Sequence, residues 1–247
     1  MIAPRNGWRS PRGRAVRAAA RGGVLLALAV LAGCAAAPMR GDPFEPANRV
    51  AFDVHEAIDG AVIRPAIQAY VDYTPELVRR GVSNFFGNID DLYSALNSAL
   101  QGKPDDFGNS LGRVMVNTGF GLAGLIDIAS EAGIPKVDED FGQTFGVWGI
   151  PQGPYLFVPL FGPSTFRDGT GFLIRAFTTP TGFIPDIPVR NVIWGMAWVN
   201  ENALIVGTSK LVDQAALDRY TFVRRAYLQR REYQVRDGKP APETEDE

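Results

Sequence analysis

The chain has 247 residues, with 25 Lys and Arg against 27 Asp and Glu and only one His and one Cys. A single cysteine excludes an intrachain disulfide, and the lack of a basic excess argues against nucleic acid as a partner. A zinc site would have to rely almost wholly on carboxylates, which suit harder cations. The composition therefore predicts no metal, no cofactor and no nucleic-acid partner.

The first 33 residues carry the pattern of a lipoprotein signal peptide. Arginines without any acidic residue precede the apolar run Val24–Ala32, which falls short of the roughly 20 residues of a membrane-spanning helix. Small residues then lead into Cys34, as in the lipobox that directs cleavage and acylation. An ordinary secretory signal that happens to contain a cysteine is the alternative. We expect residues 1–33 to be removed and Cys34 to carry acyl chains, palmitate among them, on a tether over residues 34–47.

Cleavage also changes the charge and suggests a destination. The leader contains six arginines and no acid, so its loss leaves 19 basic against 27 acidic residues. Ala35 rather than Asp follows the cysteine, which by the enterobacterial sorting rule favours the periplasmic face of the outer membrane of a Gram-negative bacterium. At the other end, residues 238–247 are acidic and lack large apolar groups, which predicts a disordered tail. Residues 48–237 between them suit one domain.

Helical periodicity dominates this domain. Thr74 and Pro75 predict an N-cap and a first-turn proline, and apolar residues three and four apart then predict a helix that Gly102 ends. The inward stripe of this helix is predicted to be Leu77, Val78, Val82, Phe85, Phe86, Ile89, Leu92, Leu96 and Leu100. A second helix should begin near Pro104, with inward residues Phe107, Leu111, Val114 and Met115.

Two further helices are predicted over residues 189–206 and 210–233. The inward stripe of the second is Leu211, Val212, Ala215, Ala216, Tyr220, Val223 and Tyr227. The opposite face should carry Arg224, Arg225, Arg230 and Arg231. Strand alternation is scarce, and the best candidate is Tyr155–Val158, in a possible short hairpin near residues 151–163. The fold class is therefore mainly α.

Two apolar segments depart from ordinary helical packing. Residues 141–166 contain no charged side chain, yet four prolines prevent a single helix, and residues 116–128 are weakly polar and rich in glycine. Irregular backbone is tolerated in an apolar medium only against protein or a water-lined cavity. A plain hydrophobic core is the alternative interpretation. We predict lipid-channel or membrane contact for Phe120, Leu122, Leu125, Phe141, Phe145, Trp148, Tyr155, Phe157, Leu160 and Phe161.

One enzyme signature occurs in the chain. Residues 108–112 match the G-x-S-x-G nucleophile elbow around Ser110. No strand is predicted before this serine, and His55, which is the only histidine, precedes it although the triad order requires a histidine after it. A serine hydroxyl without a base is a poor nucleophile. We therefore expect no enzyme and no catalytic residue, and His55 is interpreted as a surface or capping residue.

A set of short motifs resembles the MlaA/VacJ family of outer-membrane lipoproteins. The opening D-P-x-E-x-x-N-R pattern stands at residues 42–49, and further matches follow in order to about residue 238. The motif residues to which we assign structural roles are Asp42, Pro43, Glu45, Asn48, Arg49, Asn84, Asn88, Asn117, Asp127, Gly142, Gly153, Pro154, Gly162 and Arg167. The chain departs from the family at Val54 and His55, where the family often has an aromatic residue and asparagine, in a neighbourhood that matters for gating.

The resemblance implies a function that the residues alone do not. Members of this family are helical, ring-shaped proteins embedded in the inner leaflet of the outer membrane. They remove mislocalised phospholipids from the outer leaflet, through an amphipathic channel, to a soluble periplasmic carrier, and they associate with trimeric porins. We expect the same substrate, partners and role in lipid asymmetry here. A structural lipoprotein that scaffolds porins without transporting lipid is the alternative.

Overall fold

The computed structural model describes residues 42–203 and 218–239. Cys34, the signal peptide and most of the predicted tail lie outside these ranges. The elements are α2 (Glu45–Ile58), the π-helical turn η1 (Asp59–Ile63), α3 (Arg64–Tyr73), α4 (Glu76–Gln101), α5 (Pro104–Gly119), α6 (Ile128–Glu131), α7 (Phe141–Val147), β1 (Tyr155–Val158), β2 (Gly162–Thr165), α8 (Phe166–Thr178), the 3-10 turn η2 (Pro180–Phe183), α9 (Ile187–Ala203) and α11 (Arg219–Val235). The prediction of a mainly helical chain is confirmed.

The ends of the central helices follow local sequence signals. Pro75 occupies the cap position of α4 rather than its first turn, so the predicted Thr74 cap is one residue early, and no side-chain bond caps this end. α4 ends as predicted at Gly102, which adopts a left-handed φ of 72°. α5 begins as predicted at Pro104, where the missing N–H costs no helical hydrogen bond.

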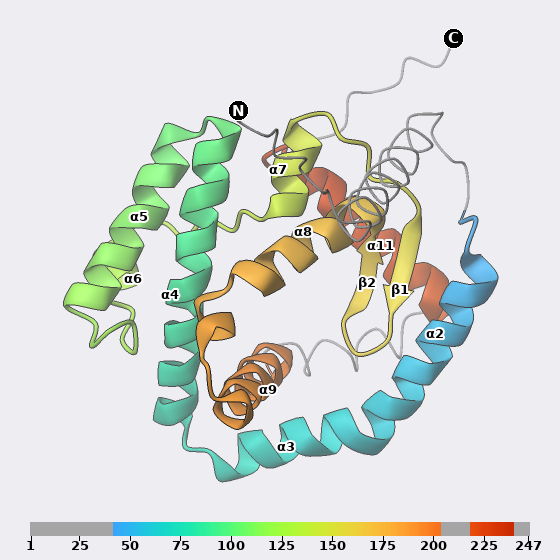
Figure 1. The fold of residues 1–247 in the computed structure, drawn as a ribbon, viewed down its shortest axis with the longest axis horizontal. Coiled ribbons are helices and arrows are strands. Elements are labelled where there is room, and N and C mark those ends of the chain that lie inside the picture. Colours follow the sequence, from blue (N-terminus) through green and yellow to red (C-terminus); the bar gives the residue numbers. More distant parts are fainter. Residues whose placement is uncertain (1–41, 204–217, 240–247) are drawn as a thin grey trace, which may run out of the picture. The chain divides into compact units, whose positions relative to one another are not determined.

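Contacts between the described elements close a circuit. Along the chain, α2 leads through η1 and α3 into α4, and α4 packs on α7 (Figure 1). α7 then contacts α11, α11 contacts β2, and β1 packs back on α2. This is the connectivity that the predicted ring requires. α8 and α9 join the circuit through α7, α3 and α4.

The predicted hairpin is confirmed, a few residues further along the chain. β1 pairs antiparallel with β2, with Tyr155 opposite Thr165 and Val158 opposite Gly162. Both Leu160 and Gly162 adopt left-handed φ angles, of 72° and 86°, in and after the connecting turn. The hairpin is the only sheet within the described residues.

The inward stripes predicted for α4 and α5 are wrong in that none of their residues is buried, although Val82, Phe86 and Ile89 of α4 are half-buried. On α4, Leu77 is 83% exposed, and Leu92, Leu96 and Leu100 are also exposed. The buried residues of α4 are Asp91, Tyr93, Ser94, Ala95, Asn97 and Ser98. On α5, Phe107 and Met115 are exposed, Leu111 and Val114 are half-buried, and the buried residues are Ser110, Arg113 and Asn117. The two helices therefore bury mainly polar residues and expose much of their apolar surface.

The later helices agree with the sequence in part. The described part of the third predicted helix is α9, from Ile187 to Ala203. In α11, Tyr220 is buried as predicted, and Val223 and Tyr227 pack at the edge of its cluster, whereas Leu211, Val212, Ala215 and Ala216 lie outside the described residues. Arg231 is buried rather than exposed, because it pairs with carboxylates from two other elements. Across the described part of the chain, no helix is both long and apolar enough to span a bilayer.

Candidate functional site

Residues 120–126 form an exposed apolar loop between α5 and α6, called here the apolar loop. Phe120 is 79% exposed and Leu122 is 66% exposed. The loop is closed by backbone hydrogen bonds, from Gly124 N to Asn117 O at 2.9 Å and from Ile126 N to Gly121 O at 2.9 Å. Its large side chains are thus held in an exposed position by a folded backbone, not by an extended linker.

Two asparagines of α4 fasten this loop and the end of α5 to the helix. Asn84 Nδ2 donates to Leu125 O at 3.1 Å, and Asn88 Nδ2 donates to Thr118 Oγ1 at 2.9 Å. Gly124 has a φ of +91°, and a Cβ at this position would lie 2.8 Å from Asn88 Nδ2. Glycine is required there both by the backbone angle and by the close approach of the asparagine.

Arg113 is the centre of a buried polar cluster beneath the apolar loop. Its Nε donates to Asp91 Oδ2 at 3.0 Å, and its Nη2 donates to both carboxylate oxygens of Asp127. Its Nη1 bonds Ser130 Oγ and Ile134 O. The side chain is 2% exposed, so all of its hydrogen-bonding capacity is met inside the protein. Arg113 therefore ties α4 and α5 to the segment after the loop.

Asn117 and Asp127 complete this cluster. Asn117 Nδ2 donates to Asp127 Oδ1 at 3.0 Å, and its Oδ1 accepts from Ala129 N at 2.8 Å. Asp127 is also the N-cap of α6, because it accepts from Ser130 N. Burial acts to raise the pKa of Asp127, but the hydrogen bonds it accepts, those from Ser130 foremost, outweigh burial and lower its pKa to about 2.

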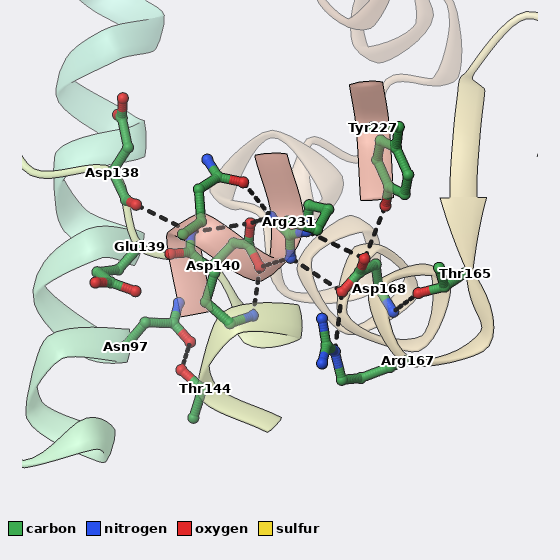
Figure 2. A network of polar contacts seen from close by, with 12 residues as sticks. Asn97, Asp138, Glu139, Asp140, Thr144, Thr165, Arg167, Asp168, Tyr227 and Arg231 are labelled. Atoms are coloured by element: carbon green, nitrogen blue, oxygen red, sulfur yellow. Dashed lines mark hydrogen bonds and ion pairs between the residues drawn. The ribbon is translucent and has the colours of Figure 1, made fainter. Parts of the chain in front are cut away.

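A second buried cluster is centred on Arg231 of α11 (Figure 2). Its Nη1 and Nη2 donate to the two oxygens of Asp140 at 2.7 and 2.9 Å. Its Nε and Nη2 donate to Asp168 at 3.1 and 3.0 Å. Asp168 also accepts from Tyr227 at 2.8 Å and from Arg167 Nε at 3.1 Å. One guanidinium thus joins α7, α8 and α11.

Gly142 makes this arrangement possible. A Cβ at residue 142 would lie 2.5 Å from Asp168 Oδ1 and 2.6 Å from Arg231 Nη2. Burial acts to raise the pKa values of Asp140 and Asp168, but the hydrogen bonds and charge of Arg231 outweigh it and hold both pKa values below the ordinary range. Both carboxylates are therefore ionised in the folded state at neutral pH.

The opening motif holds the start of α2 against β1. Asn48 Nδ2 donates to Tyr155 O at 3.0 Å, and Asn48 Oδ1 accepts from Phe157 N at 2.9 Å. The asparagine amide therefore pairs with the edge of β1 as a neighbouring strand would. Asp42 accepts from Asn48 Nδ2 and from the Tyr220 hydroxyl. Its carboxylate is fully buried.

The rest of the motif orients the same junction. Pro43 lies in the turn before α2. Arg49 pairs with Glu45 on the preceding turn of the helix and with Asp218, the N-cap of α11, at 2.8 Å each. These ion pairs are partly exposed and contribute little energy individually, so their main effect is to set the register of α2 against α11.

The remaining motif residues shape the hairpin. Gly153 has a φ of +70°, and a Cβ there would lie 3.1 Å from Phe166 Cβ. Pro154 O accepts from Phe166 N at 3.2 Å, which joins the entry of β1 to the start of α8. His55 Nδ1 accepts from Leu160 N at 3.2 Å. The histidine thus caps the turn of the hairpin, in agreement with its interpretation as a capping residue.

The residues predicted to contact lipid fall into three groups. The exposed ones are Phe120, Leu122, Leu125, Trp148, Leu160 and Phe161. Phe141 and Phe145 are half-buried. Tyr155 and Phe157 are 3% and 6% exposed and form a protein core with Phe52 and Tyr220. The prediction for Tyr155 and Phe157 is therefore corrected, because their rings contact other aromatic rings of the chain.

Other residues of these clusters were not singled out from the sequence. Arg113 and Asp91 carry the first cluster, and no motif or apolar stripe described above points to either residue. Ser110, Arg113 and Asn117 are spaced three and four apart, so a search for polar rather than apolar helical stripes would have found them. The exposed apolar faces of α8 and α9 were also missed, and Phe177 is 80% exposed.

The sequence that matches a nucleophile elbow forms part of a helix. Ser110 lies within α5 and is fully buried, so no strand-to-helix turn exposes its hydroxyl. Among the described residues, no cluster of three or more His, Cys, Asp or Glu side chains could hold a metal ion. The site is thus made of apolar surface held in place by buried polar clusters.

Acid is expected to destabilise the fold below about pH 4, the ordinary pKa range of Asp. Asp127, Asp140 and Asp168 have lowered pKa values, so their contribution to stability is present above the unfolded pKa and is lost as pH falls through the folded values. Thermal unfolding in detergent at constant ionic strength should show a plateau above about pH 5 and a decline toward pH 2. Asp127→Asn should be less stable at pH 7 and show a shallower acid decline. An unchanged decline would show that Asp127 does not contribute to the acid sensitivity of the fold.

Taken together, the fold and its clusters define a mainly helical domain with a largely polar buried interior and large apolar residues on its surface. The family model described as MlaA lipoprotein matches residues 40–234. The chain belongs to the MlaA lipoprotein family.

Similar proteins span most of the chain. The intermembrane phospholipid transport system lipoprotein MlaA of Escherichia coli (strain K12) is 31% identical over 227 residues, 88% of this chain and 89% of that protein. The protein of the same name from Haemophilus influenzae is 31% identical over 225 residues, 87% of this chain and 90% of that protein. A solved structure described as "Structural basis for maintenance of bacterial outer membrane lipid asymmetry" aligns with a TM-score of 0.70 at 30% identity, over 79% of this chain and all of that one.

Proposed function

We propose that this protein is an outer-membrane lipoprotein, anchored through acylated Cys34, that removes mislocalised phospholipids from the outer leaflet. It passes them to a soluble periplasmic carrier and so maintains the lipid asymmetry of the membrane. Membership of the MlaA family and relatives named for intermembrane phospholipid transport support the proposal. Phospholipid, the bilayer, the carrier and trimeric porins are its proposed partners.

The observation that carries the proposal is the exposed apolar surface. Phe120, Leu122 and Met115 are each at least 66% exposed at the end of α5 and in the apolar loop. Large exposed apolar patches mark sites of membrane or protein contact. The polar clusters supply hydrogen-bond partners for the irregular backbone and ion-pair partners for the buried charges. Irregular backbone whose polar groups are satisfied by protein in this way is tolerated in an apolar medium.

Charged substitutions at this surface are expected to impair transport without unfolding the protein. In a Gram-negative deletion strain, Leu122→Asp and Leu160→Asp should restore less outer-leaflet phospholipid clearance than the wild-type chain, because a charge in the hydrocarbon region costs about 2.5–3.5 kcal/mol. Gln229→Asp, at an exposed position of α11, is the matched control and should restore clearance fully. Cys34→Ser should lose clearance through loss of the anchor.

The same experiment tests the competing role of a porin scaffold. If the protein is a scaffold, the Leu122→Asp variant should restore lipid clearance as long as it still associates with porin. The purified scaffold would also carry no stoichiometric phospholipid. Phe157→Asp is unsuitable for this purpose, because Phe157 belongs to the aromatic core and its loss would unfold the domain. Full clearance by both exposed-surface variants would contradict the proposal.

A further inference from the structure

The start of α8, the end of α11 and the segment before β1 line a pocket with a volume of about 340 Å³. Its lining residues are Gln152, Arg167, Glu232, Val235 and Arg236. The pocket is far larger than the roughly 10–15 Å³ that a single water molecule needs on such a measure. It therefore admits a polyatomic ligand.

Two buried donors in this lining have no hydrogen-bond partner among the described residues. They are Gln152 Nε2 and Arg236 Nη1. The other terminal nitrogen of Arg236 pairs with Glu232 at 2.8 Å, one turn earlier on α11. Buried donors are nearly always satisfied in native proteins, and a ligand with acceptor atoms in this pocket would supply partners for both of these donors.

Arg167 adds a third donor group. It is 9% exposed, and its hydrogen bond within the described chain runs from Nε to Asp168 (Figure 2). Its terminal nitrogens therefore remain available to the pocket that the residue lines. The backbone holds this geometry, because Arg167 N donates to Gln152 O at 3.3 Å. The backbones of Arg167 and Gln152, which carry two of the three donor groups, are thus joined to each other at the start of α8.

The chemistry of these donors selects an oxyanion. The lining contains two arginines and one glutamate, so positive charge exceeds negative charge on its walls. Guanidinium forks match the oxygens of a phosphate group and bind them with short, charge-assisted hydrogen bonds. The Gln152 amide supplies a neutral donor, and the oxygens of Glu232 are partly occupied by Arg236.

We propose that this pocket binds a phosphate group through Gln152, Arg167 and Arg236. The phosphate can belong to a phospholipid headgroup or to free inorganic phosphate. The inference rests on the pocket alone and holds whether or not the protein transports lipid. Arg167 also takes part in the Arg231 cluster, so it is left intact in the test.

The test compares the thermal unfolding of the full chain in detergent in sodium phosphate and in sodium chloride of matched ionic strength. Phosphate should raise the melting temperature of the wild type in a saturable way, because a ligand that binds only the folded state stabilises it. Gln152→Leu removes an unpartnered buried donor, so it should melt at or above the wild-type temperature in chloride and lose most of the phosphate response. Arg236→Gln should weaken phosphate binding about tenfold or more.

Matched controls separate binding from folding and identify the source of the phosphate. Arg230→Gln, on the exposed side of α11, should keep the wild-type phosphate response. A short-chain phosphatidylglycerol is compared with a diacylglycerol of the same chains, which lacks phosphate. Tighter Gln152-dependent binding of the phospholipid assigns a headgroup site, and tighter binding of inorganic phosphate assigns a free-anion site. Equal responses of the wild type, Gln152→Leu and Arg236→Gln to both ligands would overturn the proposal.

Discussion

Replacing Arg231 by methionine is expected to lower the free energy of unfolding by about 3–5 kcal/mol, because it removes the cation that Asp140 and Asp168 share and leaves the buried Asp168 with Arg167 as its one ion-pair partner among the described residues. The Asp168 side chain is 7% exposed and that of Arg231 is 9% exposed. Methionine keeps much of the aliphatic bulk of arginine, so a cavity contributes little to the loss. Denaturant unfolding in detergent, followed by circular dichroism, measures the change.

Arg230→Met is the matched control for this substitution. Arg230 is the preceding residue of α11 and is exposed. Replacing an exposed arginine away from such a cluster should change the free energy of unfolding by no more than about 0.5 kcal/mol. Coincident unfolding curves for the two variants would show that the bonds from Arg231 to α7 and α8 do not stabilise the fold.

Replacing Gly121 by alanine is expected to disrupt the apolar loop. A Cβ at residue 121 would lie 2.1 Å from Ile126 O and 2.5 Å from Asn117 O. Both obstacles are backbone atoms, so the loop must open, which costs about 1–3 kcal/mol as other overpacked sites do. Under the proposed function, this variant should also lose lipid clearance in the deletion strain, because the loop no longer presents Phe120 and Leu122 together.

Gly119→Ala provides a control two residues away. A Cβ at residue 119 meets no atom within 4 Å, and alanine favours the helical end of α5 more than glycine does. This variant should therefore keep wild-type stability and clearance. Equal behaviour of the Gly119 and Gly121 variants would show that the closed backbone of the loop is not needed.

Element boundaries could be predicted from the sequence where the signal is local. Gly102 ends α4 and Pro104 begins α5 because a left-handed residue and a residue without N–H are tolerated best at those places. Tyr155–Val158 was recognised as a strand from four residues. The family resemblance points to the motif asparagines, and in the structure Asn84 fastens the apolar loop to α4 whereas Asn48 fastens α2 to β1.

The side of each helix that faces inward could not be predicted in the same way. Periodicity shows which residues share a face, but it does not show which of the two faces is buried. In α4, Leu92 and Leu96 are exposed while Asn97 is fully buried. Asn97 accepts from Thr144 Oγ1 at 2.8 Å, a partner 47 residues away in sequence. Polar pairing across such distances leaves no signal in a single sequence.

The exposed apolar residues of α4, the apolar loop and α8 also bear on the heat capacity of the protein. Unfolding normally raises heat capacity by about 12–15 cal/mol/K per residue, mainly because apolar groups become hydrated. Here residues such as Leu77, Phe120 and Phe177 are already more than three-quarters exposed in the fold, so less new apolar surface is released. The curve of stability against temperature is consequently expected to be flatter than that of a domain of equal length that buries such residues, and cold should weaken the fold less.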